Sequence, residues 1–162
     1  MLSAAEIVAL LGLEPHPEGG YFAEVFRSAN AVTSSTHAGK RRASTAIYFL
    51  LRTDEFSAFH RVSSDEVWHH YQGDPLELHV LGPRGHSRII VGSALEKGER
   101  PLAVVPSGHL QAARPLSGPH GYSLCGCTVA PGFEFRDFEM PVRARLIEEF
   151  PEHGPLISTF TR

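Results

Sequence analysis

The sequence lacks any hydrophobic run long enough to cross a membrane. Its apolar runs, such as 46–51, are far shorter than the roughly 20 residues that span a bilayer. The first residues lack the basic segment of an export signal and carry an early acid, Glu6, so we expect a cytoplasmic protein with no membrane partner. An excess of positive charge is also missing. The net charge of −3 and the pI near 6.3 argue against a nucleic-acid partner.

Cysteine is scarce. Only Cys125 and Cys127 occur, with one glycine between them. An extended chain holds two such Cα atoms near the upper limit for a disulfide, with parallel side chains, so the pattern predicts two free thiols on one strand face. Free thiols fit the reducing compartment expected for a chain without an export signal.

Glycine and proline, in contrast, are plentiful. The 162 residues include 15 glycines and 12 prolines, which is typical of short strands joined by tight turns. Hydrophobic residues make up 42 % and charged residues 20 %, which excludes a disordered chain. We expect one domain over 1–162, with an N-terminal helix in 1–13, a β-barrel core in 20–140 and a closing segment in 141–162.

Local patterns predict one helix followed mostly by strands. Ser3 and Glu6 form a capping box ahead of a short amphipathic helix, and Gly12 is placed to end it. Segment 31–42, with three adjacent cations, is expected to be an exposed loop, and 141–150 could form a short closing helix. Period-two segments predict strands at 21–27, 44–51, 56–62, 66–71, 76–81, 87–92, 102–105, 109–114, 122–129 and 133–138. This succession favours an all-β sandwich or jelly roll.

The densest polar cluster begins at His60. Period two puts His60 and Val62 on one face of a strand. It likewise puts Glu66, Trp68 and His70 together on the next strand, and a hairpin between the two would bring His60 and Glu66 onto one inner face. A histidine facing a carboxylate in an apolar barrel could be a metal site, an acid–base pair or a structural hydrogen bond.

A second segment joins a turn to a strand. Pro106 and Gly108 mark the turn, and Gln111 lies on the strand that follows. Period two puts Gln111 on one face and Leu110 on the other. Because Leu110 is apolar, the sequence leaves open which of the two faces looks inward.

These spacings resemble the two motifs of the cupin superfamily. His60, Glu66 and Gly73 match the first motif, in which a His-x-His pair is followed by Glu and Gly. The Pro-x-Gly turn followed by Gln111 matches the second motif, whose last position is histidine. Five further blocks resemble the small cupin-5 family, which is of uncharacterised function, over about residues 6–140: 16–22, 44–50, 64–69, 111–113 and 131–139. The resemblance implies a double-stranded β-helix, the cupin jelly-roll barrel, with an internal pocket and a homodimeric assembly.

The cupin resemblance also implies four metal ligands, of which only His60 and Glu66 are kept. Val62 cannot ligate a metal, and the neutral amide of Gln111 is a poor ligand for a first-row transition metal. Two ligands fall short of the three that catalytic metal sites show. Other histidines could in principle complete a site at spacings without cupin precedent: His69, His70 and His109. We therefore expect no cofactor, with a metal at His60 and Glu66 as the less favoured alternative.

The first functional hypothesis is a metal-independent isomerase or epimerase acting on a sugar-like or keto-acid substrate. His60 would be the general base and Glu66 would orient its imidazole. Tyr48 or Tyr71 would be the acid. The block 19–27 is similar to part of the deoxythymidine-diphosphate-sugar epimerases, metal-free cupins whose first-motif histidine is the catalytic base. The predicted substrate-binding residues are Gln111, Trp68, Tyr48, His70 and Arg27.

Two alternatives remain open. The chain could be a non-catalytic module that binds a small molecule, in which case the protein itself would satisfy every polar group of the pocket. Trp68 would then offer a stacking face, although ordinary core packing explains it as well. A metal-dependent oxygenase or isomerase is disfavoured by the missing ligands.

Several polar residues are expected away from the pocket. Glu77 and His79 alternate with apolar residues, which predicts a solvent or dimer face. Asp137 and Glu139 could cap a loop or line the pocket. Histidines in Gly-, Pro- and Ser-rich turns are expected at the surface: His16, His37, His86, His120 and His153.

Overall fold

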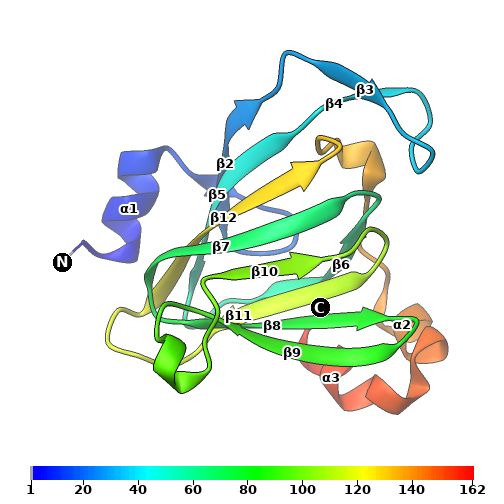
Figure 1. Cartoon of the computed structure of the whole chain (residues 1–162). Coiled ribbons are helices and arrows are strands. Elements are labelled where there is room, and N and C mark those ends of the chain that lie inside the picture. Colours follow the sequence, from blue (N-terminus) through cyan, green and yellow to red (C-terminus); the bar gives the residue numbers. More distant parts are fainter. Residues whose placement is uncertain (1) are drawn as a thin grey trace.

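The computed structural model describes residues 2–162 as two antiparallel β-sheets packed face to face (Figure 1). One sheet has the order β1-β2-β5-β12-β7-β10, formed by Glu14–Pro15, Tyr21–Arg27, Thr45–Arg52, Tyr122–Ala130, Asp65–Gly73 and Leu102–Val105. The other has the order β13-β6-β11-β8-β9, formed by Phe138–Glu139, Ser57–Val62, Leu110–Pro115, Leu76–Gly82 and Gly85–Val91. The all-β jelly roll expected from the sequence is confirmed.

Alternating side chains of both sheets form the core between them. Phe49 and Leu51 of β5 meet Leu78 and Val80 of β8 there, and the indole of Trp68 packs edge-on against Phe49. Cys125 and Cys127 are buried free thiols on the same inner face. The alternation of apolar and polar residues therefore predicts these positions, because the side chains on one face of each strand are buried away from water.

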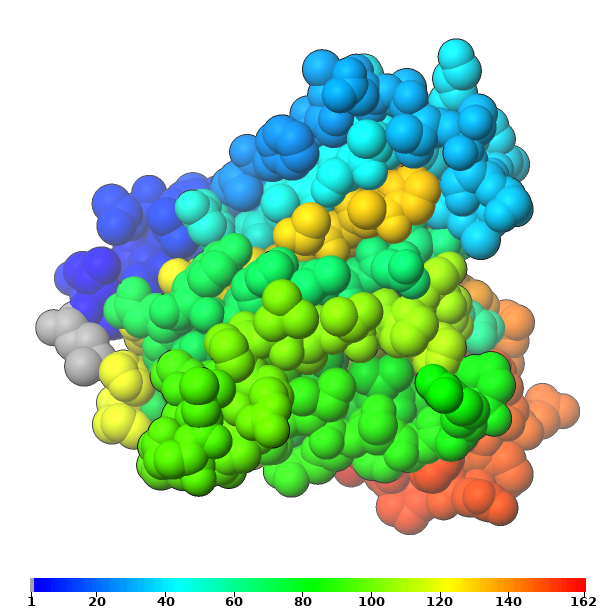
Figure 2. Space-filling view, viewed as in Figure 1, coloured from blue at the N-terminus to red at the C-terminus, as the bar shows by residue number. Residues whose placement is uncertain are grey.

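Helices cover the outer faces of the two sheets. Helix α1, Ala4–Leu11, has the predicted capping box, and its buried Ile7 packs against Leu50 and Tyr122 on the six-stranded sheet. Helix α2 (Arg143–Glu149), the 3-10 turn η3 (Pro151–His153) and helix α3 (Gly154–Thr159) cover the five-stranded sheet. Figure 2 shows helix α1 and this C-terminal cover at opposite sides of the molecule. Within residues 2–162, no helix is long and apolar enough to cross a membrane.

The C-terminal cover overturns the surface placement of Glu77 and His79. Both side chains project from the outer face of β8 and are buried, with only 4 % and 5 % of their surface exposed. The His79 ring lies 4.9 Å from the ring of Phe160, and Glu77 accepts hydrogen bonds from two arginines. Alternation located their face correctly, but it could not show that residues near the C-terminus fold over it.

The segment expected to be an exposed loop also differs. Residues Ala31–Thr33 (β3) and Lys40–Arg42 (β4) pair as a hairpin that projects beyond the six-stranded sheet (Figures 1 and 2). Arg41 is buried rather than solvated, because Asp137 accepts two hydrogen bonds from it at 2.7 and 2.8 Å. The hairpin is thereby tied to the segment that precedes β13.

Two further strand predictions are wrong. The segment 133–138 is not a strand: it forms the 3-10 turn η2, Phe135–Asp137, and enters the short strand β13. The strands β6 and β7 do not form a hairpin, because β6 pairs with β11 and β13 whereas β7 pairs with β12 and β10. The chain crosses from one sheet to the other between them. His60 and Glu66 still both face the interior, from opposite sheets.

Candidate functional site

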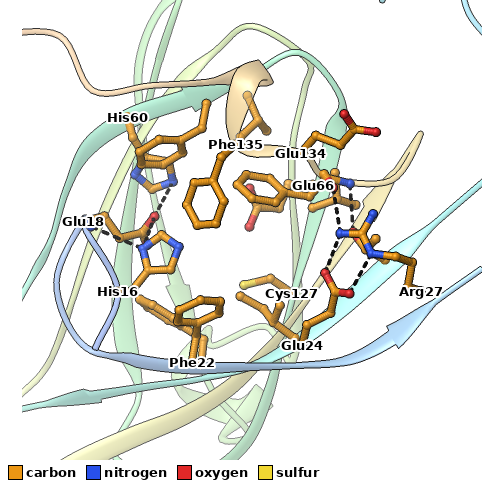
Figure 3. A pocket seen from close by; sticks show the side chains of 17 residues that line it. His16, Glu18, Phe22, Glu24, Arg27, His60, Glu66, Cys127, Glu134 and Phe135 are labelled. Atoms are coloured by element: carbon orange, nitrogen blue, oxygen red, sulfur yellow. Dashed lines mark hydrogen bonds and ion pairs between the residues drawn. The ribbon is translucent and has the colours of Figure 1, made fainter. Parts of the chain in front are cut away.

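A cavity of about 290 Å³ lies between the sheets (Figure 3). Its inner polar side chains, His16, Glu18, His60 and Glu66, come from the loop before β2 and from strands β6 and β7, whereas further polar side chains come from β2, β5 and the segment before η2. The lining residues are His16, Glu18, Phe22, Glu24, Arg27, Thr45, Ile47, Phe49, His60, Val62, Glu66, Cys127, Val129, Phe133, Glu134, Phe135 and Phe138.

A polar contact inside the cavity joins Glu18 to His60. Glu18 Oε2 lies 3.1 Å from His60 Nε2, and Ser57 donates a hydrogen bond of 2.7 Å to Glu18 Oε1. The other ring nitrogen, Nδ1 of His60, is 2.8 Å from the carbonyl oxygen of Ala58. Since a carbonyl only accepts, Nδ1 carries the proton and Nε2 presents its lone pair to Glu18.

Burial decides the protonation of this pair. Burial raises the pKa of the Glu18 carboxyl to about 8 and lowers the pKa of His60, because neither charge is well solvated there. Near neutral pH both groups are therefore uncharged. The Glu18 hydroxyl donates to Nε2 of His60, and one proton is positioned between an oxygen and a nitrogen.

Glu66 is held by a relay of two side chains behind it. The indole N–H of Trp68 donates to Gln111 Oε1 at 2.8 Å, so the amide nitrogen of Gln111 must face the carboxyl. That nitrogen donates to Glu66 Oε2 at 2.6 Å. Burial raises the pKa of Glu66, and burial raises the pKa of the neighbouring Cys127 thiol well above its ordinary value. Both groups therefore remain protonated and uncharged more readily than in water.

His16 is part of the cavity wall, not the surface. Its Nδ1 accepts the backbone N–H of Glu18 at 3.2 Å, and its ring packs edge-on against Phe22 with centroids 4.6 Å apart. Burial lowers the pKa of His16 to about 4, so its imidazole is neutral. The surface prediction failed because the Gly- and Pro-rich segment folds inward.

The inward path of this segment depends on glycine. Gly19 has a φ of +117° and Gly20 a φ of +72°, a backbone region that other residues rarely adopt. A Cβ on Gly19 would collide with the carbonyl oxygen of Phe56. The close approach at Gly19 and the turn at Gly20 carry Glu18 into the barrel. The Glu-Gly-Gly triplet was thus the available signal for Glu18, which the sequence reasoning missed.

Ion pairs and aromatic rings form the rim of the cavity. Arg27 donates two hydrogen bonds of 2.7 Å to Glu24 and one of 3.1 Å to the carbonyl oxygen of Phe133. Glu134 lies 2.6 Å from Arg136. Both carboxylates at the rim, Glu24 and Glu134, are therefore paired with an arginine, and the charge of Arg27 is neutralised by Glu24.

The predicted site residues divide into three groups. His60, Glu66 and Arg27 line the cavity, whereas Gln111 and Trp68 lie behind Glu66 and support it. Tyr48 lies on the outer sheet face, with its ring centroid 6.2 Å from that of Tyr71. His70 shares the inner face of β7 but lies four residues beyond Glu66, where its Nε2 is 3.3 Å from the carbonyl oxygen of Asp74. Neither Tyr48 nor His70 is among the lining residues.

The donor set does not fit a bound transition metal. Of the four positions implied by the cupin resemblance, Val62 presents an aliphatic side chain to the cavity and the Gln111 amide already bonds Trp68 and Glu66. The free lone pair of His60 is directed at Glu18. Across residues 2–162, no three His, Cys, Asp or Glu side chains are arranged to hold a metal ion. We therefore route no chemistry through a metal.

Comparison with known proteins identifies the family. The model of the Cupin superfamily (DUF985) family matches residues 5–141. The chain belongs to this cupin family. A hypothetical protein from Leishmania major is 38 % identical to this chain with a TM-score of 0.93, and the match covers 99 % of each of the two chains. A protein from Shewanella oneidensis is 36 % identical with a TM-score of 0.90, over 100 % of this chain and 99 % of that one.

More distant cupins share the fold alone. An oxalate decarboxylase from Bacillus subtilis has a TM-score of 0.57 at 13 % identity, over 90 % of this chain and 36 % of that chain. CapF has a TM-score of 0.57 at 10 % identity, over 79 % of this chain and 33 % of that chain. No curated protein sequence matches this cupin.

Proposed function

We propose that this cupin binds a small polar molecule in its barrel cavity and moves a proton on it without a metal, as an isomerase or epimerase does. The observation that carries the proposal is the 3.1 Å contact between Glu18 Oε2 and His60 Nε2 inside the cavity. Burial brings both groups to their neutral forms, so a proton can pass between them without creating an isolated charge.

The proton path follows from the fixed hydrogen bonds. When the Glu18 proton passes to Nε2 of His60, Glu18 becomes a carboxylate that can take a proton from a carbon beside a ligand carbonyl. Glu66 supplies a second carboxyl group, held by Gln111, that can donate a proton to the carbonyl oxygen as the enol forms. Return of the carbon proton from Glu18, to the neighbouring carbon or to the opposite face of the same carbon, gives the isomer or the epimer as an enol hydroxyl gives a proton back to Glu66. His60 then returns its proton to Glu18, which restores the protein.

The lining favours a sugar-like ligand over a keto acid. A carboxylate ligand needs a cation, and Arg27, the one arginine among the lining residues, is already engaged by Glu24. The ring of Phe22 and its aromatic neighbours offer faces for the apolar side of a sugar ring. The cavity volume of about 290 Å³ lies at the lower end of the range of about 300–1,000 Å³ for ligand pockets, so the ligand is small.

Non-catalytic binding is a second candidate. It is favoured by the fact that His60, Glu18 and Glu66 all have hydrogen-bond partners within the protein, which leaves no unpartnered base in the cavity. A binding module needs polar groups that stay as they are, whereas a catalyst needs the Glu18 proton to move.

Deuterium exchange distinguishes the two. We would incubate the protein with a panel of free sugars and hydroxy-carbonyl compounds in deuterium oxide and follow loss of carbon-bound protons by NMR. Catalysis predicts exchange by the wild type that is lost in Glu18→Gln and in His60→Ala and kept in Glu96→Gln, a matched change at an exposed position. Binding without exchange for every bound compound would leave only the binding module.

A further inference from the structure

Neither of the two buried carboxyl groups of the cavity forms an ion pair with a lysine or arginine of residues 2–162. Glu18 bonds Ser57 and His60, and Glu66 bonds the neutral amide of Gln111. The guanidinium of Arg162 donates to the backbone carbonyl oxygen of Glu18 at 2.9 Å and not to its carboxyl group, and its charge offsets only part of the rise in the Glu18 pKa that burial causes. Among residues 2–162, no lysine or arginine is therefore paired with either of these two carboxyl groups.

The rim shows the opposite arrangement. There Glu24 is paired with Arg27 and Glu134 with Arg136, at 2.7 and 2.6 Å. The same cavity thus has compensated acids at its rim and uncompensated acids inside. Since carboxylates are rarely buried without a partner, the inner pair marks the place where a positive charge is missing.

Aromatic faces surround the inner acids. The rings that line the cavity are Phe22, Phe49, Phe133, Phe135 and Phe138. The negative face of such a ring attracts a cation, and the attraction grows when water is excluded. Acids behind a wall of phenylalanines suit an ammonium group better than a hydroxyl group and exclude a carboxylate.

We infer that the ligand of this cavity carries a positively charged amine on a small ring or apolar body, with the amine hydrogen-bonded to Glu18 and Glu66. The inference rests on the proposed function for the location of the site and adds the charge of the ligand. On binding, the Glu18 proton leaves to solvent instead of passing to His60. The resulting carboxylate accepts an N–H of the ammonium group at one lone pair, and another lone pair stays available to take a proton from the ligand carbon. Charge is conserved in the cavity, because one proton is exchanged for one cation.

Three aromatic probes of similar size test this inference: benzylamine, benzyl alcohol and benzoate. Isothermal titration calorimetry of the full chain at pH 7, in two buffers of different ionisation enthalpy, gives both affinity and protons released. We expect benzylamine to bind about tenfold or more tightly than benzyl alcohol, with release of close to one proton. Benzoate should not bind.

Variants assign the effect to the inner acids. Glu18→Gln and Glu66→Gln keep hydrogen-bonding groups of the same shape, and each should remove most of the preference for the amine over the alcohol. The exposed Glu96→Gln should keep that preference. Equal affinity for amine and alcohol, preference for benzoate or no binding of benzylamine would each overturn the inference, and these wild-type results stand even if a variant fails to fold. The deuterium exchange assay is separate, so exchange of uncharged sugars would sustain the proposed function while the amine inference fails.

Discussion

Replacing Glu18 with glutamine should remove a loss of stability that the wild type suffers between about pH 6.5 and 8. The folded protein keeps the Glu18 carboxyl protonated up to a pKa of about 8, whereas the unfolded chain has released that proton above its ordinary value of 4.5. A rise in pH through this window therefore favours the unfolded chain. The contribution of protonated Glu18 to stability is full below pH 4.5 and is lost as the pH rises through 8.

The window above pH 6.5 isolates the buried carboxyls. Burial lowers the pKa of His16 and of His60. Because the unfolded chain holds these protons up to the ordinary histidine pKa of 6.5, the two histidines make the folded protein more stable as the pH rises, but only up to pH 6.5. Above that value they no longer contribute a slope. From pH 6.5 to 8 a single retained proton changes the free energy of unfolding by about 2 kcal/mol, at roughly 1.4 kcal/mol per pH unit. The raised pKa of Glu66 acts in the same direction.

Urea unfolding followed by circular dichroism at several pH values measures this slope. Glutamine reproduces the protonated acid, because its oxygen can accept from Ser57 and its amide can donate to His60. We expect Glu18→Gln to be more stable than the wild type already at pH 6.5, and we expect this difference in the free energy of unfolding to grow by about 2 kcal/mol between pH 6.5 and pH 8. Glu96→Gln, with the same change in net charge, should follow the wild type. Parallel curves for wild type and Glu18→Gln would show that Glu18 titrates normally, and the neutral pair with His60 would be refuted.

Three other changes test the support of the site. Gln111→Leu should lower the free energy of unfolding by about 2 kcal/mol or more in urea, because the Glu66 carboxyl and an indole N–H lose a buried partner; wild-type stability would contradict the relay. Arg41→Met should lower the melting temperature and weaken binding of the benzylamine probe, because the turn beside the cavity loses the hydrogen bonds between Arg41 and Asp137. Unchanged binding would show that the hairpin does not support the cavity. Val62→His combined with Gln111→His restores the residue types that ligate the metal in other cupins. Elemental analysis of the untagged variant should therefore show about one more metal ion per chain than the wild type. Equal metal content in the two proteins would mean that the four side chains do not converge.

Features of the fold that depend on neighbouring residues in the sequence could be predicted from it. Strand positions followed from alternation, because a strand between two layers must bury one face, and Tyr21–Arg27 and Leu102–Val105 were located to the residue. The helix at Ala4–Leu11 followed from its caps. His60 and Glu66 were correctly assigned to the interior because each shares a face with apolar neighbours.

Contacts between distant segments could not be predicted in this way. Ser57 and Glu18 are 39 residues apart, and Arg41 and Asp137 are 96 apart, so no periodicity links them. The strand pattern therefore predicted Glu66 as the carboxyl partner of His60, whereas the carboxyl group in contact with His60 is that of Glu18. Burial of His79 depends likewise on a distant residue, since its ring packs against that of Phe160 near the C-terminus.

The absence of two cupin metal ligands and the contact of Glu18 with His60 are electrostatically related. A divalent ion at His60 and Glu66 would keep the carboxyls ionised and would need the lone pair of Nε2. Without suitable donors at Val62 and Gln111, that lone pair accepts a proton from Glu18 instead, and Gln111 turns from a ligand position into a support for Glu66. Uncompensated acids in an apolar cavity then stay neutral until a positive group enters. The proposed proton transfer at Glu18 and the proposed selection of a cationic ligand therefore depend on the same missing charge, and the variant with restored metal ligands should lose both when it gains its metal.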